Sequence, residues 1–134
     1  MKGFRKDTRR KKSLFESFVF AGRGLRWVLA GQRNMKIHLA VTSAVFIAAA
    51  WFKITLLELA LLIFAVALVL AAEMLNSAIE KTVDLVTGEY HPLAGQAKDA
   101  AAGAVLLAAF FSVIIGVLVF YPYVGKWFTG IIFK

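Results

Sequence analysis

Carboxylate and amide side chains recur along residues 73–84 at the spacing of one helix face. Glu73, Asn76, Glu80 and Asp84 lie at positions i, i+3, i+7 and i+11, and Ser77 falls beside them. In an α-helix this spacing places all of these side chains on one side. Three carboxylates in a row repel one another unless a positive charge lies among them, and hard oxygen ligands suit a divalent cation. The pattern therefore indicates a polar site that binds a cation.

Glu73 is the strongest candidate for chemistry in this row. It directly follows an apolar run, residues 54–72, in which only Thr55 and Glu58 are polar. An ionisable group at the edge of a hydrocarbon region is a candidate functional residue. Partial removal from water makes a carboxylate a better proton acceptor, which is what a general base requires.

A purely structural interpretation of the same residues is also open. Glu80 and Asp84 can form a solvated helix face, and Asn76 can donate a hydrogen bond to a neighbouring helix. Lys98 can pair with one of the carboxylates near the membrane surface. Residue spacing alone does not decide between this interpretation and a catalytic one.

The composition identifies the class of protein that must position these residues. The chain has 134 residues, of which 60% are hydrophobic, and its mean hydropathy is +0.75. Soluble domains are only about half apolar. Three long apolar segments therefore predict an all-α membrane protein with three transmembrane helices in a single domain spanning residues 1–134. The absence of cysteine excludes disulfides and thiolate metal sites.

Positive charge is concentrated at the N-terminal end. Residues 1–36 carry eleven Lys and Arg against Asp7 and Glu16, whereas the remaining residues sum to −1. No basic patch recurs further along, so we expect no nucleic-acid partner. Beside a first membrane helix this bias predicts an N-terminus on the cytoplasmic side of the membrane, near anionic lipid. No cleavable signal peptide is expected.

Local signals divide the chain into segments. We expect a basic tail at 1–12, a surface helix at 13–31 that begins with a Ser13–Glu16 capping box, and a turn at 32–36. Helices containing the three spans are predicted at 36–52, 54–87 and 92–121, followed by an outer interfacial tail at 122–134. Lys53 and the C-terminus are then outside, and the acidic row is at the cytoplasmic face.

The motifs that run from Glu73 to Leu106 resemble the prokaryotic diacylglycerol kinase family of small membrane-bound lipid kinases. The resemblance rests on Glu73-x-x-Asn76-x-Ala-Ile-Glu80-x-x-Val-Asp84, on Glu89-Tyr-His-Pro-Leu-Ala94 and on Ala97-Lys-Asp-Ala-Ala-Ala-Gly-Ala-Val-Leu106. Residues 21–25 and 33–38 fit it too, so that it covers about Ser13 to Phe120. The amino-acid sequences of these motifs most resemble those of the Gram-positive branch, whose members include undecaprenol kinases.

The resemblance implies phosphorylation of a lipid hydroxyl by ATP with Mg²⁺, in a homotrimer whose active sites are shared between protomers. Glu73 matches the catalytic base and lipid-contacting residue, and Asn76 helps to position the hydroxyl or a phosphate oxygen. Glu80 matches a metal ligand that bridges to ATP. The remaining matches, all on the ATP side, are Glu89, Tyr90, His91, Lys98 and Asp99, and Gln32 is assigned to the same side although it differs from the family residue.

Two positions depart from the family pattern. Gln32 stands where relatives have a second metal-binding glutamate; its amide oxygen can bind Mg²⁺ but adds no charge. Ser13 stands where relatives have an arginine near the nucleotide, and Arg9 to Lys12 could substitute for it. No Walker A or protein-kinase motif is present. The leading hypothesis is an undecaprenol kinase, with a diacylglycerol kinase and a non-catalytic, cation-binding membrane bundle as alternatives.

Overall fold

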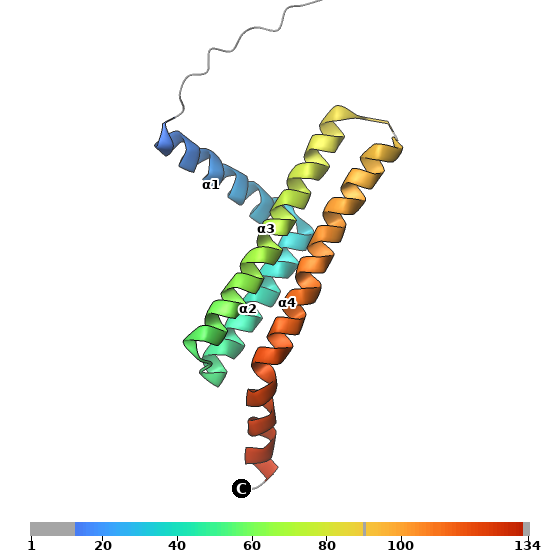
Figure 1. Ribbon diagram of the computed structural model, residues 1–134. Coiled ribbons are helices and arrows are strands. Elements are labelled where there is room, and N and C mark those ends of the chain that lie inside the picture. The colour runs from blue at the N-terminus through green and yellow to red at the C-terminus, as the bar shows by residue number, and fades with distance from the viewer. Residues whose placement is uncertain (1–12, 90, 133–134) are drawn as a thin grey trace, which may run out of the picture.

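The computed structural model describes residues 13–89 and 91–132, and all of its regular elements are helices. In chain order they are α1 (Leu14–Gly31), α2 (Arg33–Phe52), α3 (Leu56–Val86) and α4 (Pro92–Ile132). Helices α2, α3 and α4 run side by side, and α1 projects from them at an angle (Figure 1). The predicted all-α class with a separate N-terminal helix is confirmed.

Helix α1 begins with the predicted capping box. The backbone N–H of Glu16 donates to Ser13 Oγ at 3.2 Å, and the Glu16 carboxylate accepts from the Ser13 N–H at 3.1 Å. Both contacts satisfy donors that a helix start leaves unpaired. Leu14, Phe15 and Phe18 remain strongly exposed, as expected for a helix whose apolar side rests against a membrane surface.

The turn predicted at 32–36 is shorter than expected. Only Gln32 separates α1 from α2, and its extended backbone (φ −92°, ψ 125°) is enough to redirect the chain. Helical hydrogen bonding resumes immediately, with the N–H of Lys36 donating to the Gln32 carbonyl at 3.3 Å. Helix α2 therefore has 20 residues, about 30 Å at 1.5 Å per residue, which is the thickness of a bilayer core.

The connection between α2 and α3 is also short, with three residues between the two helices. Lys53 adopts the left-handed conformation (φ 52°, ψ 50°) that commonly ends a helix. Thr55 then caps α3 through a second capping box, in which the N–H of Glu58 donates to Thr55 Oγ1 at 3.3 Å. Sequence analysis did not identify this box, although the Thr-x-x-Glu spacing is its usual signature.

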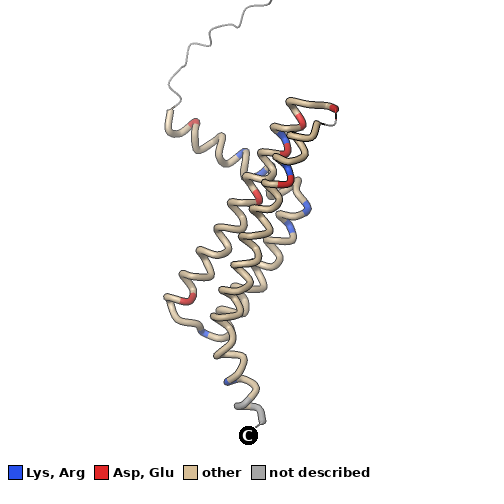
Figure 2. Tube along the Cα trace, turned by 45° about the vertical axis from the view of Figure 1, so that its right-hand side comes forward, with Lys and Arg blue, Asp and Glu red and all other residues tan. Residues whose placement is uncertain are grey.

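Helices α3 and α4 form a long antiparallel hairpin with contacts along its length. Helices α2, α3 and α4 each contain a segment long and apolar enough to cross a membrane. Because the apolar run of α3 ends at Ala72, residues 73–86 continue about 21 Å beyond it. Figure 2 shows most acidic residues at this end of the hairpin. The chain is therefore a membrane protein with a projecting polar end.

The C-terminal segment differs from the prediction. Helix α4 does not end at Tyr121 but passes through Pro122 and reaches Ile132. Proline lacks the N–H that would bond to the carbonyl four residues earlier, so it weakens a helix at one position. On the C-terminal side of Pro122, Tyr123 packs beside Phe52 with ring centroids 6.1 Å apart, and this contact holds the helix in place.

Candidate functional site

Three polar side chains are buried where α1, α2 and α3 meet. Glu73, Asn76 and Ser77 are 2%, 5% and 1% exposed, and all three belong to α3. The buried residue of α1, Val28, and Met35 near the start of α2 lie on either side of the α1–α2 connection. Helices α1, α2 and α4 all contact α3, and packing against α3 removes the first part of the acidic row from solvent.

Two buried oxygen atoms in this cluster, Glu73 Oε2 and Asn76 Oδ1, have no hydrogen-bond partner among the residues that the structure describes. The Asn76 amide nitrogen donates to Glu80 Oε1 at 3.1 Å, which aims its oxygen away from Glu80. Leaving a buried polar acceptor unpaired is costly. Such a pair of acceptors is suited to a hydroxyl donor or a cation supplied from outside the chain.

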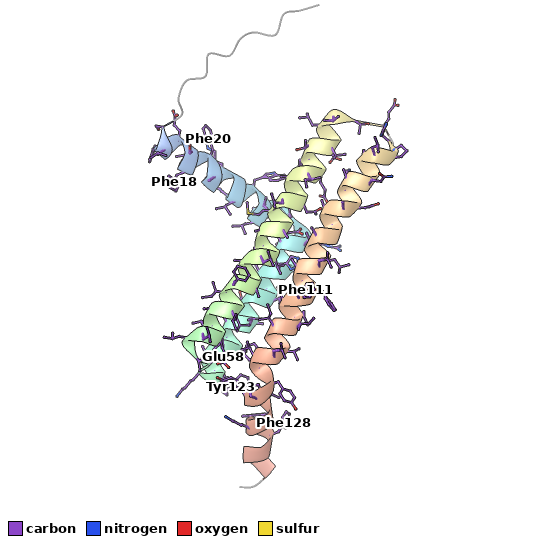
Figure 3. The ribbon with its side chains drawn as sticks, viewed as in Figure 1. Phe18, Phe20, Glu58, Phe111, Tyr123 and Phe128 are labelled. Atoms are coloured by element: carbon purple, nitrogen blue, oxygen red, sulfur yellow. The ribbon has the colours of Figure 1, made fainter. Side chains whose placement is uncertain are left out.

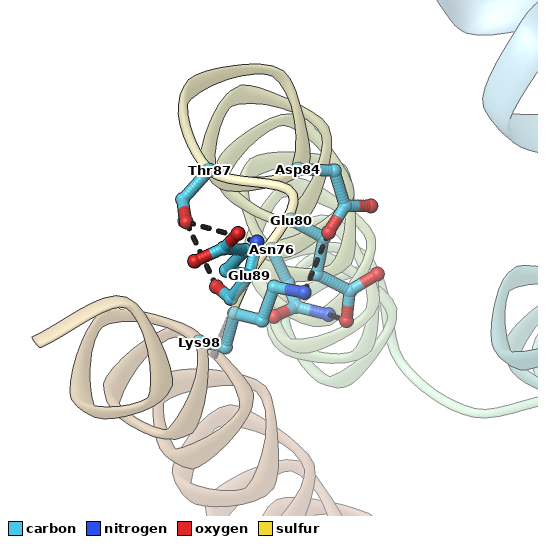
Figure 4. A network of polar contacts seen from close by, with 6 residues as sticks. All are labelled: Asn76, Glu80, Asp84, Thr87, Glu89 and Lys98. Atoms are coloured by element: carbon cyan, nitrogen blue, oxygen red, sulfur yellow. Dashed lines mark hydrogen bonds and ion pairs between the residues drawn. The ribbon is translucent and has the colours of Figure 1, made fainter. Parts of the chain in front are cut away.

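Asp84, the last residue of the acidic row, joins α3 to α4. Lys98 Nζ donates to Asp84 Oδ1 at 2.6 Å (Figure 4). Asp84 follows the apolar run that ends at Ala72, and Lys98 precedes the apolar run that begins at Ala100, so both lie outside these runs. This hydrogen bond lowers the pKa of the Asp84 carboxyl and raises the pKa of the Lys98 ammonium. Both groups therefore stay charged near neutral pH. Because they are well exposed, the pair aligns the helices more than it stabilises them.

The loop between α3 and α4 is held by short-range contacts. Thr87 Oγ1 donates to the Glu89 carbonyl at 2.8 Å and accepts from the Glu89 N–H at 3.3 Å. The side chain of His91 caps α4, accepting from the Leu93 N–H through Nδ1 at 3.2 Å. In its neutral form His91 therefore carries its proton on Nε2, which remains able to donate to an anion.

The predicted site residues divide into two groups. Asn76 and Glu80 are joined by a hydrogen bond, Glu73 lies within electrostatic range of Glu80 to complete this cluster, and Lys98 reaches the same helix through Asp84. Within residues 13–89 and 91–132, Gln32, Glu89, His91 and Asp99 make no hydrogen bond or ion pair with that cluster. Tyr90 and the basic residues 9–12 lie outside the described residues.

The side-chain oxygen atoms of the cluster are suitable ligands for a hard divalent cation, although they do not form a complete site in one chain. Carboxylate and amide oxygens from Glu73, Asn76 and Glu80 are the ligand type that Mg²⁺ prefers. Among the described residues, no three His, Cys, Asp or Glu side chains are grouped closely enough to hold a metal ion. Any cation here would need additional ligands, as Mg²⁺ commonly obtains from water and phosphate.

Two contacts of α3, one at the site and one at its other end, were not predicted from the sequence. His38 of α2 lies within electrostatic range of Glu73, together with Glu80. At the other end of α3, Tyr123 donates to Glu58 Oε2 at 2.6 Å. The polar character of His38 and Glu58 within apolar segments was the available signal, but it did not identify either partner.

Comparison with known proteins places the site in a family context. A family model described as prokaryotic diacylglycerol kinase matches residues 19–120. Undecaprenol kinase from Bacillus subtilis is 44% identical over 108 residues, covering 81% of this chain and 88% of that protein. Diacylglycerol kinase from Escherichia coli K12 is 42% identical over 111 residues (79% and 87%), and that from Synechocystis is 45% identical over 105 residues (78% and 60%).

Proposed function

The chain belongs to the prokaryotic diacylglycerol kinase family, and from this premise we propose that it phosphorylates undecaprenol to undecaprenyl phosphate. The family makes it a lipid kinase that uses ATP as the phosphate donor. The choice of undecaprenol is supported by the similarity to the Bacillus subtilis enzyme. The observation that supports the catalytic role is the buried Glu73 carboxylate oxygen, which has no hydrogen-bond partner among the described residues and directly follows the apolar run at 54–72.

In the proposed reaction Glu73 is the general base. Its free Oε2 accepts the proton of the lipid hydroxyl while the hydroxyl oxygen bonds to the γ-phosphorus of ATP. The bond between that phosphorus and the bridging oxygen of ADP breaks, so the products are a lipid phosphate and ADP. Asn76 Oδ1 is also buried without a hydrogen-bond partner among the described residues, and we assign Asn76 to help position the hydroxyl or a phosphate oxygen. Because Glu73 lies at the membrane edge, the lipid chain can stay in the bilayer during the reaction.

Phosphoryl transfer depends on positioning and charge neutralisation more than on covalent chemistry. We assign Glu80, and Gln32 with its neutral amide, to a Mg²⁺ ion that neutralises phosphate charge when bound. Asn76 holds the Glu80 carboxylate in place through its 3.1 Å hydrogen bond. Lys98 and Asp99 are assigned to the phosphates, and Glu89, Tyr90 and His91 to the nucleotide. The Nε2–H of His91 is a suitable donor for this purpose.

We further propose that the enzyme is a homotrimer with active sites shared between protomers. Leu85 and Val86 are 87% and 79% exposed on the part of α3 that extends beyond its apolar run. Apolar side chains outside the membrane favour contact with a second protein surface. A neighbouring protomer would also supply ligands that the cation site of one chain lacks.

The proposed topology places the N-terminus, Glu73 and Asp84 on the cytoplasmic side of a bacterial plasma membrane, with Lys53 and the C-terminus outside. The native chain has no cysteine, so Lys53→Cys and Asp84→Cys can each be labelled in intact cells without a background. We expect a membrane-impermeant maleimide to modify position 53 and to spare position 84. Labelling of position 84 with protection of position 53 would reverse the orientation.

An assay of purified enzyme with Mg-ATP tests the proposed substrate. Undecaprenol and diacylglycerol are presented separately in the same detergent, and the rate of transfer of labelled γ-phosphate to each lipid is measured. We expect kcat/KM to be at least about tenfold higher for undecaprenol, which corresponds to about 1.4 kcal/mol of selective binding. A preference for diacylglycerol would instead establish the second candidate, and no turnover of either lipid would favour a non-catalytic bundle.

A further inference from the structure

An apolar groove of about 360 Å³ runs along the membrane-spanning parts of α2, α3 and α4. Its walls include Val41, Leu62, Val69, Val113, Gly116 and Phe120. Ser112 also lines the groove, but its hydroxyl is directed to the carbonyls of Ala65 and Ala108, at 3.1 and 2.7 Å. The groove therefore presents an apolar surface, and the hydrogen of its Ser112 hydroxyl is already used in hydrogen bonds to the backbone. It is suited to a hydrocarbon chain.

The inner end of the groove lies toward the candidate active site. His38 lines the groove and is also within electrostatic range of Glu73. One side of the groove remains open, because Val113 and Val117 are 65% and 59% exposed. A lipid could therefore enter sideways from the bilayer and present its hydroxyl to Glu73 while its chain lies along α4.

The outer end of the groove is formed by Phe120. Its ring lies 6.1 Å from that of Phe52, which is in turn 6.1 Å from the ring of Tyr123. The Tyr123 hydroxyl donates to Glu58 Oε2 at 2.6 Å, and Thr55 Oγ1 donates to the same oxygen at 2.7 Å (Figure 3). These contacts join α2, α3 and α4 behind Phe120. Tyr123 lies beyond the segment that matches the family.

We propose that this groove holds the hydrocarbon chain of the lipid substrate and that Phe120, backed by Phe52 and Tyr123, limits how much of the chain it holds. The inference rests on the proposed lipid kinase function and adds a determinant of chain specificity. From Ala109 to Phe120 the α4 wall rises about 16 Å, roughly half of a bilayer core. The rest of a longer chain would leave through the open side.

The first test fills the groove. A Cβ at Gly116 would meet nothing within 4 Å, so the side chain of Gly116→Leu can begin without a clash and extend into the groove that Gly116 lines. With a series of prenyl alcohols from geraniol to geranylgeraniol, we expect the native enzyme to show a KM that falls as prenyl units are added. Gly116→Leu should raise the KM for geranylgeraniol by roughly tenfold, with kcat little changed, and should remove the dependence on length.

The second test extends the groove. Phe120→Ala removes the ring at the outer end of the groove. The KM of this variant should keep falling for one prenyl unit beyond the length at which the native KM levels off, and that unit should lower the KM by about threefold. The gain is modest because the chain leaves a bilayer or micelle that is already apolar. Gly125→Leu is the matched control, since its Cβ is also unobstructed and it does not line the groove. It should leave the length dependence unchanged.

A readout that does not need turnover separates this inference from the proposed function. A prenyl alcohol with a terminal photoreactive diazirine should crosslink near Gly116 and Phe120, as located by mass spectrometry. If the enzyme prefers diacylglycerol, the same kinetic series is run with diacylglycerols of increasing acyl length. Crosslinks elsewhere, or an unchanged length dependence in Gly116→Leu, would overturn the groove assignment. Crosslinks in the groove of a chain without kinase activity would overturn the proposed reaction alone.

Discussion

Glu73→Gln is expected to lower kcat by about 10²- to 10⁴-fold, the usual contribution of a general base. Glutamine keeps the size of the side chain but its amide cannot accept the hydroxyl proton. Because Glu73 Oε2 has no hydrogen-bond partner in the described structure, the substitution breaks no contact at that atom. The measurement is initial rate with saturating Mg-ATP and lipid, using enzyme whose helix content matches that of the native protein.

Glu58→Gln provides a matched control on the same helix. Glu58 lies 15 residues from Glu73, about 22 Å along α3. Its amide oxygen can still accept from Tyr123, which now donates to the carboxylate, so kcat should stay within a few-fold of the native value. Near-native turnover by assembled Glu73→Gln would disprove the general-base assignment.

Glu80→Gln is expected to increase the Mg²⁺ concentration for half-maximal rate by at least about tenfold. Loss of a carboxylate weakens a site for a hard cation, and disturbing residues that merely support a metal ligand already costs 10- to 100-fold in affinity. The amide can retain contact with Asn76, so the local geometry should survive. The measurement is a titration of rate against free Mg²⁺ at constant Mg-ATP.

The companion variant Gln32→Glu tests the second position of the same cation site. It adds a carboxylate charge at this position, and should lower the required Mg²⁺ if Gln32 is a ligand. An unchanged requirement would leave Gln32 as the residue that redirects the chain between α1 and α2, a role its extended backbone already fills. Unaltered Mg²⁺ dependence in Glu80→Gln would mean that the acidic row is not the metal site.

Features that depend on neighbouring residues in the chain were predictable from the sequence. The row from Glu73 to Asp84 lies on one helix face because helical periodicity alone determines it, and the Asn76–Glu80 hydrogen bond is its direct product. The Ser13–Glu16 capping box is likewise local. The three apolar segments follow from length and composition. The family motifs then identified the lipid kinase class.

Boundaries and partners were decided by tertiary packing. Helix α2 begins at Arg33 because one extended residue suffices to change direction, and α4 continues past Pro122 because Tyr123 packs on Phe52 and bonds to Glu58. Glu58 and Tyr123 are 65 positions apart, so no local pattern could pair them. The burial of Glu73 required other helices to pack against α3. Periodicity determines which residues share a face, but only the arrangement of the helices determines what that face meets and whether water reaches it.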